Sequence, residues 1–153
     1  MADQDTLQLI SDLFNDGKEL PDTSETQFRI APAFTDDRGD IINVITGLPM
    51  THLAVITCTE GSVRGNHYHP EPQFMYLVDG EYEVTTIPLN EDGTLQHRNK
   101  YISVARRGTL SYCPPNLVHA YRFTKPSIFL NICTGEGREP KDFEQHTTRL
   151  QVL

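Results

Sequence analysis

The sequence predicts an all-β protein of one domain, preceded by one short helix, and three observations support this. The chain has 153 residues, which suits a single domain with a substantial core. From Phe28 onward, short apolar segments alternate with turn residues. No helical spacing recurs between those segments. Closely spaced strands without intervening helices indicate an antiparallel sandwich or barrel.

The N-terminal part has a different pattern. Residues 5–15 place four apolar side chains at helical spacing: Leu7, Ile10, Leu13 and Phe14. Residues 17–27 are polar and contain a proline, as is typical of a linker. We therefore expect a helix and linker over 1–27 and the β domain over 28–153. The helix needs a partner, either one end of the β domain or a second copy of the chain.

The expected strands are bounded by Gly, Pro, Asn and Asp clusters. In chain order they cover 28–34, 40–46, 52–59, 62–69, 73–79, 81–88, 100–105, 109–113, 118–124 and 127–134. The Asp79-Gly80 pair is typical of a tight hairpin and predicts that the strands on either side of it pair directly. Residues 89–99 are polar and predict an exposed loop.

Composition excludes several classes of function. There are 13 basic and 21 acidic side chains, for a net charge of −8, and no basic stripe, so a phosphate backbone would repel the chain. No apolar run approaches the roughly 18 residues that span a bilayer. The first ten residues also lack the basic and apolar regions of a secretory signal, which predicts a cytoplasmic protein. Three cysteines at unrelated spacings indicate buried thiols rather than disulfides or a cysteine zinc site.

The residues with the clearest chemistry lie between 61 and 123. His67 and His69 are two apart, so on a strand both leave the same face. Gln73 opens the next expected strand after a proline-containing turn, and His119 lies near the start of a later one. Imidazole nitrogens suit Zn, Fe, Ni or Cu, and an amide oxygen can be a further neutral ligand.

These residues match two motifs of the cupin family. The first, G-x5-H-x-H-x3-E-x6-G, is matched by Gly61, His67, His69 and Gly80, with Gln73 in place of its Glu. The second, G-x5-P-x-G-x2-H-x3-N, is matched by Gly108, Pro114 and His119, with Asn116 in place of its second Gly and Phe123 in place of its Asn. The resemblance implies a single jelly-roll β-barrel whose interior site is lined by His67, His69, Gln73 and His119.

A narrower resemblance is to the nucleotide-sugar branch of the cupins. Asp37-Arg38-Gly39, followed by Arg64-Gly65-Asn66-His67-Tyr68-His69, looks like the signatures of dTDP-4-keto-6-deoxyhexose 3,5-epimerases, 3,4-ketoisomerases and capsular polysaccharide cupin domains. It implies that His67 is a general base and that Arg64 binds substrate. The epimerases have Gln where this chain has His69. The resemblance also implies a homodimer, in which Arg38 contacts substrate phosphate from the neighbouring subunit.

Whether the site holds a metal is open at this level. Three histidines and an amide at motif spacing favour a divalent transition metal, such as Zn, Fe, Ni or Mn. The exchange of Glu for Gln at position 73 removes a negative charge, which weakens metal binding and equally suits a metal-free site. The same histidines would then be hydrogen-bonded or catalytic groups in an empty barrel.

Other residues are placed by strand alternation. Tyr121 shares parity with His119 and should point inward, as an acid, an orienting hydroxyl or a packing residue. Asn131 is a candidate interior polar group for substrate. Arg64 faces away from His67 unless Gly65 forms a bulge. Tyr76 should face outward, and the histidines outside both motifs should be exposed: His52, His97 and His146.

The leading functional expectation is isomerisation or epimerisation of a keto-sugar attached to a nucleotide, as the resemblance implies. One alternative is a metal-dependent dioxygenase or lyase acting on a small carbohydrate or organic acid. Another is a non-catalytic barrel that binds a small molecule.

Overall fold

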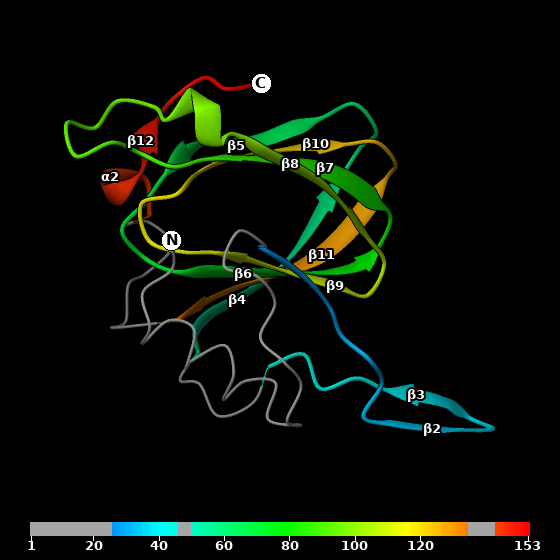
Figure 1. The fold of residues 1–153 in the computed structure, drawn as a ribbon. Coiled ribbons are helices and arrows are strands. Elements are labelled where there is room, and N and C mark those ends of the chain that lie inside the picture. Colours follow the sequence, from blue (N-terminus) through cyan, green and yellow to red (C-terminus); the bar gives the residue numbers. More distant parts are fainter. Residues whose placement is uncertain (1–25, 46–49, 135–142) are drawn as a thin grey trace.

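The computed structural model describes residues 26–45, 50–134 and 143–153, and they form two facing β-sheets (Figure 1). The expected N-terminal helix, and most of the segment 1–27 that contains it, lie outside the described residues. None of the described helices is long and apolar enough to cross a membrane.

The first sheet has the strand order β1-β9-β6-β11-β4. Its strands are β1 (Gln27–Arg29), β9 (Thr109–Cys113), β6 (Gln73–Asp79), β11 (Ser127–Thr134) and β4 (Met50–Cys58). The second sheet has the order β12-β5-β10-β7-β8. Its strands are β12 (Thr148–Arg149), β5 (Val63–Tyr68), β10 (Val118–Phe123), β7 (Glu81–Ile87) and β8 (Tyr101–Arg106). All pairings are antiparallel.

The remaining elements are short. A separate two-stranded hairpin, β2 (Phe34–Asp36) with β3 (Gly39–Ile41), projects away from the two sheets (Figure 1). A 3-10 turn, η1 (His97–Asn99), interrupts the polar loop before β8, and the helix α2 (Phe143–His146) precedes β12.

The core lies between the sheets, because alternate residues of each strand point inward. Nine buried residues form it: Cys58, Met75, Leu77, Tyr82, Val84, Ala105, Tyr121, Phe123 and Phe129. A second apolar cluster includes Phe28, Phe74, Tyr76 and Leu110 and belongs to the opposite face of the first sheet. Tyr76 therefore faces outward, as its parity predicts.

Nearly all expected strands are present, but two features of the arrangement differ from expectation. The described strands form two separate sheets rather than one closed, hydrogen-bonded barrel. Asp79 and Gly80 also do not close a hairpin, because β6 lies in one sheet and β7 in the other. This turn instead carries the chain from the first sheet to the second. It leaves no room for a side chain at Gly80, because a Cβ there would lie 2.5 Å from the Pro126 carbonyl oxygen.

Candidate functional site

The histidines of the two motifs lie on or beside two paired strands. His67 of β5 is directly opposite His119 of β10. Residues directly opposite in an antiparallel pair project from the same face of the sheet. On β10 that face is the inward one, since Tyr121 and Phe123 share it and belong to the core. His69 follows directly after β5, so all three imidazoles reach the space between the sheets.

A bulge in β5 aims both His67 and Arg64 inward. The ladder with β10 is irregular here: His67 pairs with His119 and Gly65 with Ala120, which leaves Asn66 as the extra residue. Gly65 and Asn66 both have positive φ, at 83° and 56°. The extra residue shifts the alternation, so Arg64 lies opposite Tyr121 on the inward face. This is the bulge on which the sequence argument for Arg64 depends.

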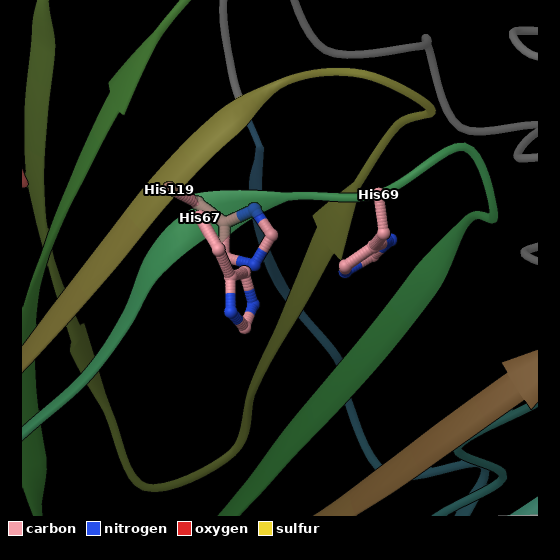
Figure 2. Close-up of side chains that lie close together, drawn as sticks. All are labelled: His67, His69 and His119. Atoms are coloured by element: carbon pink, nitrogen blue, oxygen red, sulfur yellow. The ribbon is translucent and has the colours of Figure 1, made fainter. Parts of the chain in front are cut away.

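The three imidazoles form one tight cluster (Figure 2). Their ring centroids are separated by 4.7 Å between His67 and His119, 5.1 Å between His69 and His119, and 5.5 Å between His67 and His69. One ring nitrogen from each lies within 4.8 Å of the others. His119 is buried, whereas His67 and His69 are half-buried.

Backbone carbonyl groups set the tautomers of two of these rings. The Nδ1 of His119 is 2.9 Å from the Leu117 carbonyl oxygen, and the Nδ1 of His69 is 2.7 Å from the Glu71 carbonyl oxygen. A carbonyl only accepts, so in each neutral ring Nδ1 carries the proton and Nε2 carries a lone pair. The Nε2 of His119 is buried without a hydrogen-bond partner among the described residues.

The surroundings keep His69 and His119 neutral. Burial, and then the nearness of His67 and His69, lowers the pKa of His119 to about 3. Burial also lowers the pKa of His69, and the Gln73 oxygen opposes this effect because it would accept a hydrogen bond from the Nε2 of the protonated ring. Clustered imidazoles with free lone pairs can bind a metal ion or accept a proton.

Gln73 brings an amide to the same point from the facing sheet. Its Oε1 is 3.2 Å from the Nε2 of His69, and its Nε2 donates a hydrogen bond to the Oδ1 of Asn131. Because Nδ1 holds the proton of neutral His69, two atoms with lone pairs, Oε1 and Nε2, lie side by side. Two ligands of one metal ion have this arrangement.

These residues therefore fit a divalent transition metal. Three imidazoles and an amide oxygen suit Zn, Fe, Ni or Mn. The Nε2 of His119, buried without a hydrogen-bond partner among the described residues, is a ligand atom that a metal would satisfy. The carbonyl groups that hold Nδ1 of His69 and His119 correspond to the outer hydrogen bonds that orient metal-bound histidines.

The turn of the second motif is tied to the first. Asn116 has φ 61°, and its N–H donates a 2.8 Å hydrogen bond to the carbonyl oxygen of His69. Asparagine is among the few residues that adopt this left-handed conformation readily, so it serves where the motif usually has glycine. The departure at Asn116 thus preserves the backbone geometry that holds His69 near His119.

Arg64 and Tyr121 occupy the inward position next to the paired His67 and His119, and Arg64 as a whole residue is exposed. Arg64 donates from Nε to the Sγ of Cys58 at 2.9 Å, and no carboxylate pairs with it within the described residues. Tyr121 is buried with its ring centroid 5.5 Å from that of His119. Burial raises the pKa of Tyr121 well above its ordinary value, so it stays a neutral hydroxyl.

The two remaining candidates are placed differently. Arg38 lies in the tip of the β2–β3 hairpin, where it forms an exposed ion pair with Asp36, so a single chain does not bring it to the histidines (Figure 1). Its predicted contact with substrate stays a prediction. Asn131 is buried and faces inward, where it contacts Gln73.

One inward histidine was not expected. His97 and His146 are exposed as predicted, but His52 is half-buried. It lies on the inward face of β4, directly opposite Cys133, which in turn lies opposite Gln73. His52 and Cys58 are six residues apart in the expected strand 52–59, so they share a face. A buried Cys58, as the sequence predicts for its thiols, would therefore have predicted an inward His52.

All three cysteines are free thiols, and two of them, Cys58 and Cys113, are buried.

Solved structures with this fold include several sugar-modifying enzymes. A dTDP-4-dehydrorhamnose 3,5-epimerase from Sulfolobus tokodaii has a TM-score of 0.63 at 14% identity, over 82% of this chain and 76% of that one. A 3'-monoepimerase from Streptomyces bikiniensis, in complex with dTDP-quinovose, has a TM-score of 0.67 at 17% identity, over 87% and 73%. A 3,4-ketoisomerase from Helicobacter canadensis has a TM-score of 0.60 at 19% identity, over 80% and 88%. Likeness at these identities establishes the fold.

Comparison by sequence gives the family. No curated protein sequence matches the chain significantly. The cupin family model matches residues 40–134. This span contains both histidine motifs and eight of the ten strands of the two facing sheets, and only β1 and β12 lie outside it. The chain therefore belongs to the cupin family.

Proposed function

We propose that the protein is an enzyme that isomerises or epimerises a keto-sugar attached to a nucleotide. The observation that carries the proposal is a cluster of three imidazoles beside an arginine that has no carboxylate partner within the described residues. The histidines suit proton transfer at a carbon next to a ketone, and Arg64 suits the negative charge of a nucleotide diphosphate. Enzymes of similar fold act on dTDP-sugars, as their names state, which supports the same substrate class.

The chemistry requires a base and a group that stabilises an oxyanion. A proton next to a ketone is acidic because the charge left behind spreads to the oxygen as an enolate. In a metal-free site, His67 would remove this proton, since it is half-buried and adjoins both other imidazoles. The Tyr121 hydroxyl, kept neutral by burial, would donate to the developing oxyanion.

We also propose that His67, His69, Gln73 and His119 hold a divalent transition metal. The support is the pair of lone-pair-bearing atoms at 3.2 Å and the unpartnered Nε2 of His119. Such a metal supplies a Lewis acid that stabilises negative charge on the carbonyl oxygen. His67 would then be a ligand without a lone pair for the proton, and another group would be the base. Metal content therefore decides the role of His67.

The same donor set favours one other candidate, a metal-dependent dioxygenase or lyase acting on a small carbohydrate or organic acid. Three histidines and one amide would hold such a metal without filling every coordination position, so oxygen or a chelating substrate could also bind it. A redox metal together with oxygen consumption would favour this candidate over the isomerase.

The proposed isomerase is tested by turnover in deuterated water. Purified protein, analysed for metal, is incubated with a 4-keto-6-deoxyhexose linked to dTDP. The expected result is deuterium at the carbon next to the ketone, and its loss in the His67→Ala variant. Absence of exchange, together with a ligand-induced rise in melting temperature, would contradict catalysis and indicate a binding protein.

A pair of arginine variants tests the substrate class. Loss of a charge-assisted hydrogen bond costs about 1.5 to 3 kcal/mol, so Arg64→Ala should raise KM by about ten-fold or more. Arg122→Ala is the matched control, because Arg122 is exposed like Arg64 but lies on the neighbouring strand β10 and faces the other side of the sheet. Equal effects of the two substitutions would contradict a specific role for Arg64.

We propose in addition that the protein is a homodimer joined through the β2–β3 hairpin. Phe34 and Ile41 pair across this hairpin with 51% and 57% of their surfaces exposed. An isolated two-stranded hairpin is at best marginally stable in water, so a second copy that covers this apolar surface would stabilise it. Arg38, at the tip, could then reach the partner's site.

A further inference from the structure

Asn131 is buried beside the Gln73 amide and contacts it. It lies on β11 opposite Met75, one inward-facing position before Cys133, which lies opposite Gln73. Only 7% of its surface is exposed. Its Oδ1 accepts a hydrogen bond from the Nε2 of Gln73, and its Nδ2 lies 3.8 Å from the Sγ of Cys133. Both ends of the Asn131 amide are therefore engaged.

The orientation of the Gln73 side chain matters because the two ends of an amide are chemically opposite. The oxygen can bind a metal, whereas the NH2 group has no lone pair to offer. If the amide turned over, the NH2 group would face the Nε2 of His69, 3.2 Å from the present oxygen position. It would then donate a hydrogen bond to Nε2 and use the lone pair that a metal requires. One rotation would thus remove two ligands.

We propose that Asn131 is a positioning residue that holds the oxygen of Gln73 toward the histidine cluster. By accepting from Gln73 Nε2, Asn131 Oδ1 keeps the NH2 group on the side away from His69. The inference rests on the proposed metal centre and deepens it. It also explains why the arrangement suits glutamine: a carboxylate has oxygen at both ends and needs no such orientation.

The experiment measures affinity for Co²⁺ alone, by titrating the visible absorption of the purified full-length protein. Asn131→Leu has nearly the same volume and removes the acceptor, and we expect it to weaken Co²⁺ binding by about ten-fold or more, as for other outer hydrogen bonds of metal sites. Asn131→Asp keeps an acceptor for the Gln73 NH2 group and should retain affinity within a few-fold of the unmodified protein, or exceed it. Ser127→Ala, a buried polar residue at the other end of β11, is the matched control and should change nothing.

A second background separates positioning from general damage. Gln73→Glu should bind Co²⁺ more tightly, because it adds a negative charge to the site. In this background Asn131→Leu should change the affinity by less than about three-fold, since either carboxylate oxygen can face the metal. Melting temperatures of all variants report whether they remain folded.

The outcomes distinguish the two proposals. If the unmodified protein binds no Co²⁺, the proposed metal centre fails and the role of Asn131 fails with it. If it binds Co²⁺ and Asn131→Leu binds equally well, only the role of Asn131 is overturned. The same holds if Asn131→Leu weakens binding equally in both backgrounds, because Asn131 would then act independently of the Gln73 amide.

Discussion

His119 is the histidine whose environment constrains it most. Only 1% of its surface is exposed, its Nδ1–H is directed at the Leu117 carbonyl oxygen, and its ring centroid lies within 5.1 Å of those of His67 and His69. With a pKa of about 3, it is neutral wherever the protein is expected to work. The lone pair of this neutral ring can bind a metal ion or accept a hydrogen bond from a substrate hydroxyl. Because the ring carries no charge, it does not repel a cation.

The lowered pKa of His119 makes stability depend on pH. Between about pH 6.5 and pH 3 the unfolded chain binds a proton at this residue that the folded chain does not, so stability falls as pH falls through this window. At pH 5 the expected loss from this residue alone is about 2 kcal/mol relative to pH 7.

Urea unfolding at both pH values, with a chelator present, measures this effect. Carboxylates also titrate in this range, so the comparison is with His119→Gln, which has no proton to bind there. The unmodified protein should lose about 2 kcal/mol more than the variant between pH 7 and pH 5. Equal losses would show that the His119 pKa is not lowered in the folded protein.

At the scale of single residues, the sequence predicted the members of the histidine cluster, but it did not predict the residues that hold them in position. Spacing alone predicted that His67 and His69 share a face, and the family motifs added Gln73 and His119. The contact of Asn131 with Gln73 could not be predicted, because 58 residues separate them in the chain. Local spacing contains no information on which strands become neighbours.

The bulge in β5 is the element on which the site depends most. It reverses the alternation between Arg64 and His67 and leaves no room for a side chain at Gly65. A Cβ there would lie 2.6 Å from the His119 carbonyl oxygen and 3.0 Å from the Ala120 Cα. The bulge is also secured from outside, because the Oδ1 of Asn66 accepts hydrogen bonds from the N–H groups of Val152 and Leu153 at 2.9 and 3.0 Å.

We therefore expect Gly65→Ala to destabilise the protein by about 3 kcal/mol or more. The positive φ alone costs about 1 to 2 kcal/mol with any other residue, and the backbone contact adds to it. Gly93→Ala is the matched control, since Gly93 has φ 80° and nothing within 4 Å of a new Cβ. It should cost only the backbone term, as measured by urea unfolding. Similar losses for both variants would contradict the close approach of β5 and β10 at this point.

Strand positions were predicted more accurately than strand partners. The expected strands 73–79, 109–113 and 127–134 agree with β6, β9 and β11 at both ends. The hairpin expected at Asp79-Gly80 was wrong, because a turn-forming pair specifies a tight reversal but not whether the following strand returns to the same sheet. Here β7 pairs with β8 and β10 instead, since its inward residues, such as Tyr82 and Val84, face the first sheet across the core.

For the whole molecule, the projecting hairpin predicts a change of oligomeric state on mutation. The double substitution Phe34→Ser and Ile41→Ser should convert the proposed dimer to a monomer, because it removes the apolar surface of the hairpin. Light scattering of the purified protein should give twice the chain mass before substitution and once after it. Val104→Ser, which alters an equally exposed apolar residue on β8, should leave the dimer intact. A monomeric unmodified protein would contradict the proposal.

The sequence by itself determined that the chain is mostly β, where most strands lie, and which histidines belong to one site. These properties follow from local periodicity and from motif spacing, which the order of residues contains directly. Only the tertiary structure decided that the strands divide into two facing sheets, that a bulge directs Arg64 inward, and that Asn131 contacts Gln73. Each of these depends on which distant segments pack together, and that choice is made by burial of the shared core between the sheets rather than by any segment alone.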